Sequence, residues 1–75
     1  MANKTIIDTL SEYQKNYLYD TYEAMKCNEK SNPKRAEVQS QALWEIAQFL
    51  SEDKGREAYC EIMEYCEKRY EQENN

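Results

Sequence analysis

The order of apolar and polar positions along the 75-residue chain predicts a protein made of helices. In three segments the apolar residues recur every three or four positions, which is the spacing of one face of an α-helix. We expect these helices at about residues 6–27, 33–51 and 55–71. The chain contains one glycine and one proline, too few turn-forming residues for a sheet with several hairpins. The sequence therefore predicts an all-α fold, a small antiparallel three-helix bundle in one domain (residues 1–75); the alternative is a helical hairpin that completes its core by dimerising.

The first expected helix, residues 6–27, follows Thr5, which has with Asp8 the spacing of a capping box. Its predicted buried face consists of residues at helical spacing: Ile6, Leu10, Tyr13, Tyr17, Thr21 and Ala24, flanked by Ile7, Leu18 and Met25. That face leaves Tyr19 and Tyr22 on the opposite side of the helix. Tyrosines outside a core are enriched at binding interfaces, so both are candidates for contact with a partner.

The second expected helix, residues 33–51, has a defined start, because Asn32 is suited to cap it and Pro33 is suited to the first helical position. Its predicted buried face is formed by Ala36, Leu43, Ile46, Ala47 and Leu50, with Ala42 and Phe49 widening it. Trp44 lies about 100° from the centre of that face at the angular spacing of a helix. Trp44 is therefore another candidate for contact with a partner.

The stretch "SEDKG", residues 51–55, is the expected turn before the third helix. Ser51 can cap a helix, and Gly55 can adopt a left-handed backbone angle. The pattern does not decide whether the second helix ends at Ser51 or runs on to Lys54.

The third expected helix, residues 55–71, has an apolar side and an acidic side. The apolar side carries Tyr59, Ile62, Met63, Cys66 and Tyr70, whereas the opposite side carries Glu57, Glu61, Glu64 and Glu71 with Lys68 among them. Glu67 lies beside this acidic stripe, and Tyr65 flanks the apolar side. The stripe is about 21 Å long, with a carboxylate about every 5 Å, not far from the roughly 3.4 Å between phosphates along one DNA strand. Such a stripe can fit a groove that holds a nucleic-acid backbone.

The net charge is −5 at pH 7 and is unevenly distributed. Residues 1–50 carry seven acidic and six basic side chains, whereas residues 51–75 carry eight and four. A protein that binds nucleic acid directly needs a basic face, so we expect no direct DNA or RNA binding. No apolar run approaches the ~18 residues of a membrane span, and no hydrophobic signal segment follows Met1. The three cysteines are an odd number, which fits reduced thiols better than a set of disulfides. We therefore expect a cytoplasmic protein that does not associate with a membrane.

The side chains that metal sites and catalysis usually require are missing from the sequence. There is no histidine, no Cys-x-x-Cys pair and no glycine-rich phosphate loop. Cys60 and Cys66 lie about 9 Å apart along a helix axis, which exceeds the ~7 Å limit for a disulfide. We expect Cys66 to be buried and Cys27 and Cys60 to be accessible. The sequence thus predicts a protein that is not an enzyme and has no metal or cofactor.

The acidic stripe and the expected exposed aromatic residues favour a protein-binding function. We expect the chain to act as an inhibitor or modulator that covers a basic, nucleic-acid-binding surface of a partner protein, such as a nuclease. The candidate contact residues are Glu57, Glu61, Glu64, Glu67, Glu71, Tyr65, Trp44, Tyr19 and Tyr22. The alternative is a structural or adaptor module in which a homodimer buries the exposed aromatic residues.

In size, acidity, tyrosine content and lack of catalytic residues, the chain resembles the small inhibitors that phages and mobile elements encode against host defence nucleases, anti-CRISPR proteins among them. The resemblance covers no motif and transfers no functional residue. It implies a compact inhibitor that acts by occluding its target.

Overall fold

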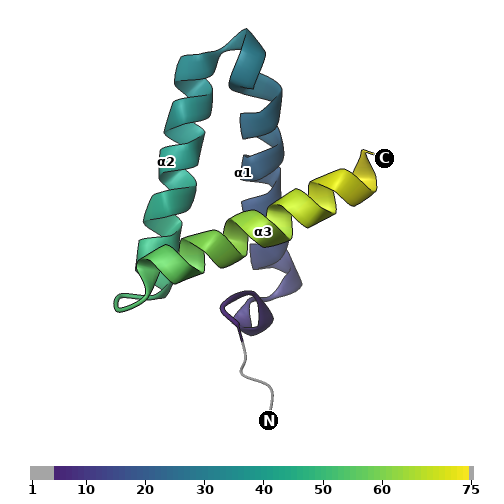
Figure 1. Ribbon diagram of the computed structural model, residues 1–75. Coiled ribbons are helices and arrows are strands. Elements are labelled where there is room, and N and C mark those ends of the chain that lie inside the picture. Colours follow the sequence, from purple (N-terminus) through teal and green to yellow (C-terminus); the bar gives the residue numbers. More distant parts are fainter. Residues whose placement is uncertain (1–4, 75) are drawn as a thin grey trace.

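Three α-helices and a short 3-10 turn make up the structure, a computed structural model that describes residues 5–74 (Figure 1). In chain order the elements are η1 (Ile7–Thr9), α1 (Glu12–Ser31), α2 (Pro33–Leu50) and α3 (Gly55–Glu73). α1 and α2 form an antiparallel hairpin, and α3 lies across both of them (Figure 1). No strand occurs among residues 5–74. The predicted all-α fold, with three helices packed against one another, is confirmed.

The N-terminal turn and α1 each begin at a capping box of their own. The predicted box is present: the Thr5 amide donates to Asp8 Oδ2 at 3.2 Å, and the Asp8 amide donates to Thr5 Oγ1 at 3.3 Å. It starts only η1, because Leu10 is extended (φ −90°, ψ 147°) and interrupts the helical backbone. α1 starts at a second box, in which Ser11 Oγ accepts from the Gln14 amide at 3.2 Å and Gln14 Oε1 accepts from the Ser11 amide at 2.8 Å. The prediction of one helix from residue 6 is therefore wrong at its start.

A single residue, Asn32, separates α1 from α2. α1 ends at Ser31, later than the predicted end at Cys27. Asn32 Oδ1 accepts from the Arg35 amide at 3.3 Å, and Pro33 is the first residue of α2, so the predicted cap is confirmed. This short connection makes α2 run back along α1 (Figure 1).

The turn between α2 and α3 brings the two helices close together. α2 ends at Leu50 and α3 begins at Gly55, and within the turn Ser51 Oγ accepts from the Lys54 amide at 3.2 Å. The predicted left-handed angle at Gly55 is wrong, because no residue in the described range has a positive φ. Gly55 is instead buried, and a Cβ atom there would overlap the side-chain amide of Gln48. The glycine therefore leaves room for the end of the Gln48 side chain at the start of α3.

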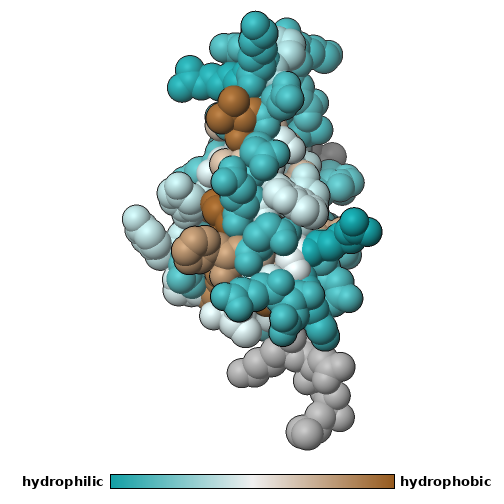
Figure 2. All heavy atoms as spheres, turned by 90° about the vertical axis from the view of Figure 1, so that its left-hand side faces the viewer, coloured by the Kyte–Doolittle hydropathy of each residue, from teal (hydrophilic) through white to brown (hydrophobic). Residues whose placement is uncertain are grey.

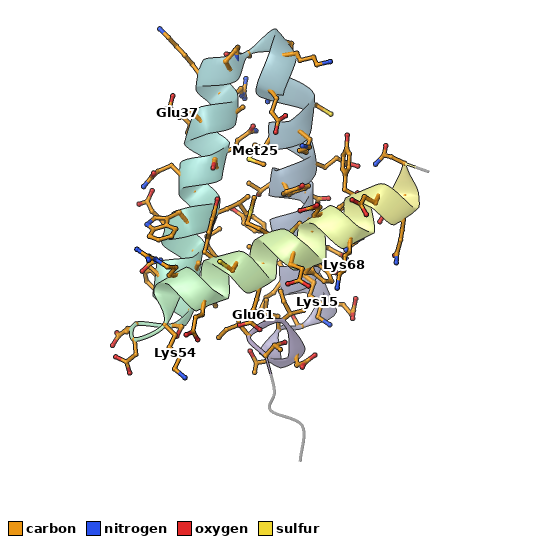
Figure 3. All side chains as sticks on the ribbon, in the orientation of Figure 1. Lys15, Met25, Glu37, Lys54, Glu61 and Lys68 are labelled. Carbon is orange, nitrogen blue, oxygen red and sulfur yellow. The ribbon has the colours of Figure 1, made fainter. Side chains whose placement is uncertain are left out.

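The core lies where α3 crosses the hairpin. α1 contributes Leu18, Tyr19, Tyr22 and Met25, α2 contributes Ala36, Leu43 and Ala47, and α3 contributes Ala58, Ile62 and Cys66. Figure 3 shows Met25 pointing between α1 and α2. The predicted apolar side of the third helix is confirmed, because all five of its residues are buried or pack against the core.

The predicted buried face of the first helix is wrong at its two tyrosines, whereas Leu18 and Met25 are buried and Ile6, Ile7 and Leu10 pack against the core. Tyr13 and Tyr17 are 81% and 59% exposed, whereas Tyr19 and Tyr22 are only 2% and 5% exposed. The prediction counted Leu10 as part of the helix, and the extended backbone at Leu10 removes that residue from the angular pattern of α1. Because α3 packs against the side of α1 that carries Tyr19 and Tyr22, the side with Tyr13 and Tyr17 stays open.

α2 likewise turns two residues of its predicted buried face towards solvent. Phe49 is 92% exposed and Leu50 is 38% exposed. At the angular spacing of a helix, Phe49 lies about 120° from the buried Leu43. α3 packs on the other side of α2, where Trp44 contacts Tyr59, so nothing within residues 5–74 covers Phe49.

Candidate protein-binding surfaces

Five glutamates on α3 form a charged surface that we call the acidic face: Glu57, Glu61, Glu64, Glu67 and Glu71. Four of them are exposed, and Glu61 is half-buried. Because all five belong to one helix, their backbone positions are fixed relative to one another along about 21 Å of helix axis. The structure therefore brings the five predicted carboxylates together on one element.

Two members of the acidic face also make contacts within the protein. Glu61 Oε1 accepts from the Ile6 amide at 3.3 Å, and Figure 3 shows Glu61 on the side of α3 next to η1. Glu64 pairs with Lys68 at 3.1 Å, but both side chains are more than two-thirds exposed, so this pair contributes little to stability. The other three members make no salt bridge to another described residue. Their charge is therefore available to a partner.

Arg69 connects α3 to α1, a role that the sequence did not predict. Its guanidinium lies 4.3 Å from the centre of the Tyr19 ring, and its Nη1 donates to Asn16 Oδ1 at 2.9 Å. Within α3 it donates to Glu73 Oε2 at 2.7 Å and to the Tyr65 hydroxyl at 3.2 Å, and these two hydrogen bonds raise the pKa of Arg69. The sequence signal for this residue was its four-residue spacing to Glu73, whereas its contacts with α1 depend on the tertiary structure.

The aromatic candidates are less exposed than predicted. Tyr19 and Tyr22 belong to the core, and desolvation raises the pKa of the Tyr19 and Tyr22 hydroxyls. The Tyr22 ring packs edge to face on Tyr70, with ring centres 6.0 Å apart. They are therefore removed from the candidate surface. Trp44 is half-buried and packs edge to face on Tyr59 with ring centres 5.1 Å apart. It keeps part of its surface in solvent at the boundary between α2 and α3.

Apolar side chains gather on the side of the α1–α2 hairpin that α3 does not cover. We call this surface the hairpin face, and it consists of Leu10, Tyr13, Tyr17, Ile46, Phe49 and Leu50. A groove of about 200 Å³ runs along it, lined additionally by Gln14 and Leu18. Viewed from the side of α2, Figure 2 shows apolar surface interrupting a mostly hydrophilic exterior. The sequence predicted that all six residues belong to the core, whereas only Leu10 and Ile46 pack against it.

The thiols follow the sequence prediction. Cys66 is buried, and desolvation raises its pKa to about 12, with Arg69 acting in the opposite direction. Cys27 and Cys60 are exposed. Within residues 5–74, no three His, Cys, Asp or Glu side chains are grouped so that they could hold a metal ion. No helix in that range has the length and apolar character needed to cross a membrane.

Comparisons of the chain with protein-family models, with curated proteins and with solved structures find no match. The structure itself offers two surfaces as candidates for function. The acidic face is charged and lies on α3, whereas the hairpin face is apolar and is formed by α1, α2 and Leu10 before them.

Proposed function

We propose that this protein is a non-enzymatic binding module that docks the acidic face of α3 on a basic surface of a partner protein. The observation that carries the proposal is the exposure of Glu57, Glu64, Glu67 and Glu71 on a single helix. A surface with one sign of charge attracts a partner of opposite charge and raises the rate of association.

The packing of α3 supports this function. Ile62 and Cys66 anchor the helix in the core, and Arg69 ties it to α1 through Asn16 and Tyr19. The backbone that carries the carboxylates is therefore held in place before a partner binds. Less conformational entropy is then lost on binding, which favours affinity.

The partner class that fits best is a protein that handles nucleic acid, such as a nuclease. Its substrate channel is basic, and the carboxylate spacing of about 5 Å along the helix is near the phosphate spacing of about 3.4 Å. Occupation of that channel would exclude the nucleic acid, so the module would inhibit its partner without binding nucleic acid itself. This is the mode of action of an anti-CRISPR-like inhibitor encoded by a phage or mobile element. The three free cysteines support a reducing compartment such as the cytoplasm.

A charge-reversal experiment tests the acidic face. The double variant Glu67→Lys/Glu71→Lys changes two members that make no salt bridge to a described residue, so the fold should be kept. Proteins captured from a lysate of the source cells by the wild-type chain, identified by mass spectrometry, should include nucleic-acid-binding proteins with basic surfaces. The double variant should capture these at least about tenfold less, because reversing two of the five charges removes most of the attraction and of its steering effect.

The matched control reverses two charges away from the acidic face, in the variant Asp20→Lys/Glu37→Lys, whose original side chains are also exposed. This control has the same net charge as the test variant and should capture the same proteins as the wild type. Equally reduced capture by both double variants at low salt would show that only net charge matters, and undiminished capture by the test variant would contradict the proposal.

A further inference from the structure

The hairpin face is an apolar surface that the fold leaves uncovered. Tyr13 is 81% exposed, Tyr17 is 59% exposed and Phe49 is 92% exposed. The groove between α1 and α2 is lined by Leu10, Tyr13, Gln14, Tyr17, Leu18, Ile46 and Leu50, none of which carries a formal charge. A surface of this composition is unfavourable in water and is typical of an interface.

The apolar surface continues along the hairpin beyond the aromatic residues. On α1 the positions that follow Tyr17 at helical spacing are Thr21 and Ala24, and on α2 the position one turn before Ile46 is Ala42. These small side chains are half-buried. A helix of a second molecule can approach closely over such small residues.

The exposed aromatic area is a substantial part of what a specific dimer needs. With about 200 Å² for each aromatic side chain, Tyr13, Tyr17 and Phe49 together expose roughly 450 Å². A standard interface removes about 800 Å² from each partner, so these three side chains supply more than half of one side. The remaining residues of the hairpin face and the small residues beside them extend the contact.

The charge distribution also permits two copies to meet at this surface. The acidic excess lies in residues 51–75, which carry eight acidic and four basic side chains, and the acidic face belongs to α3. Two hairpins packed face to face would keep both α3 helices on the outside of the assembly. Electrostatic repulsion between the copies is therefore small despite a net charge of −5 on each. Two acidic residues, Glu45 and Glu52, stand beside Phe49 at the edge of the surface.

We propose that a second copy of this chain covers the hairpin face, giving a two-fold symmetric dimer in which Tyr13, Tyr17 and Phe49 of each copy pack on the other. A small domain gains much of its stability from such an association, because a core of this size buries little surface on its own. The dimer presents two acidic faces, one on each outer side. The proposal does not depend on the partner of the acidic face, since it concerns a different surface.

Sedimentation equilibrium of the purified full chain tests the dimer. The wild type should have the mass of a dimer at micromolar concentration. Phe49→Lys and Tyr13→Lys each place a charge in the interface, and both should raise the dissociation constant of the dimer at least about tenfold. Both original side chains are largely exposed in the monomer, so circular dichroism should show the same helix content as in the wild type.

The matched control is Gln41→Lys, which introduces the same charge on α2 at an exposed position away from the hairpin face. This variant, like the charge-reversed variant Glu67→Lys/Glu71→Lys, should remain a dimer. A wild type that stays monomeric through the micromolar range overturns the proposal. The proposal is then overturned even if Phe49 binds a different protein. A dimer that persists in both Phe49→Lys and Tyr13→Lys also overturns it.

Discussion

Tyr19 on α1 is covered by Arg69 on α3, a contact that forms only when the chain folds. The Arg69 guanidinium lies over its ring, and the Arg69 side chain is held in that position by hydrogen bonds to Asn16 and Glu73. The Tyr19 hydroxyl has no hydrogen-bond partner among the described residues, which costs about 1–3 kcal/mol. The burial of the ring and its contact with the cation offset that cost.

Cys66 should make the protein less stable at alkaline pH. Burial raises its pKa from 9.0 to about 12, so the thiol stays protonated in the folded protein while it ionises in the unfolded chain. The stability that follows from this difference is fully present below pH 9 and is lost as the pH rises towards 12. At pH 10.5 the loss should be roughly 2 kcal/mol of unfolding free energy, measured by urea denaturation and compared with pH 8.

The control for this prediction is Cys66→Ala, which removes the titrating group. Its stability should fall less between pH 8 and pH 10.5 than that of the wild type. A smaller decline should remain, because the raised pKa values of Tyr19 and Tyr22 act in the same direction above pH 10. Equal declines in the two proteins would show that Cys66 is not responsible.

At the scale of the elements, the ends of the helices follow local hydrogen bonds. Asn32 caps α2 as predicted, because the required residues lie next to one another in the chain. The prediction was wrong for α1, where two capping boxes occur six residues apart, at Thr5 and at Ser11. The first starts a single 3-10 turn and the second starts a helix of 20 residues. Each box satisfies the amides at its own start, but neither determines how far the helix continues.

The two capping boxes should differ in their contribution to stability. Ser11→Ala removes the cap of α1 and should lower the unfolding free energy by about 1 kcal/mol. Thr5→Ala removes the corresponding bond of η1, which contains no buried residue, and should lower it by less. Urea denaturation of both variants at the same pH measures the difference. An equal or larger effect of Thr5→Ala would mean that η1 contributes more to the fold than its burial indicates.

At the scale of the whole molecule, the core is small and its centre lies where α3 crosses the hairpin. A chain of this length has an unfolding free energy of about 4–11 kcal/mol. Ile62 is completely inaccessible to solvent, whereas Phe49 is 92% exposed, although the sequence placed both on buried helix faces. The consequences of truncating the two side chains should therefore differ.

Ile62→Ala should lower the unfolding free energy of the monomer by about 2–5 kcal/mol, because it leaves a cavity at the centre of the core. Phe49→Ala should change that quantity by less than about 0.5 kcal/mol. Thermal and urea denaturation followed by circular dichroism at the lowest practical protein concentration separates this effect from any contribution of dimerisation. A loss of similar size in both variants would contradict the position of the core.

The sequence alone was enough to predict the properties that depend on neighbouring residues. The all-α fold, the cap at Asn32 and the apolar side of α3 with the buried Cys66 follow from hydrogen bonds and periodicity within short segments. The acidic face could be predicted for the same reason. Its five glutamates lie on one helix, and both ends of that helix were predicted within two residues.

Only the tertiary structure decided which side of α1 packs inwards. α1 has apolar and aromatic residues on both sides, so the periodicity is compatible with burial of either Tyr13 and Tyr17 or Tyr19 and Tyr22. The choice depends on where α3 lies, and that position is held by contacts such as the one between Arg69 and Asn16, which are 53 residues apart in the chain. Because α3 can cover one side of the hairpin and not both, the other side remains as the hairpin face.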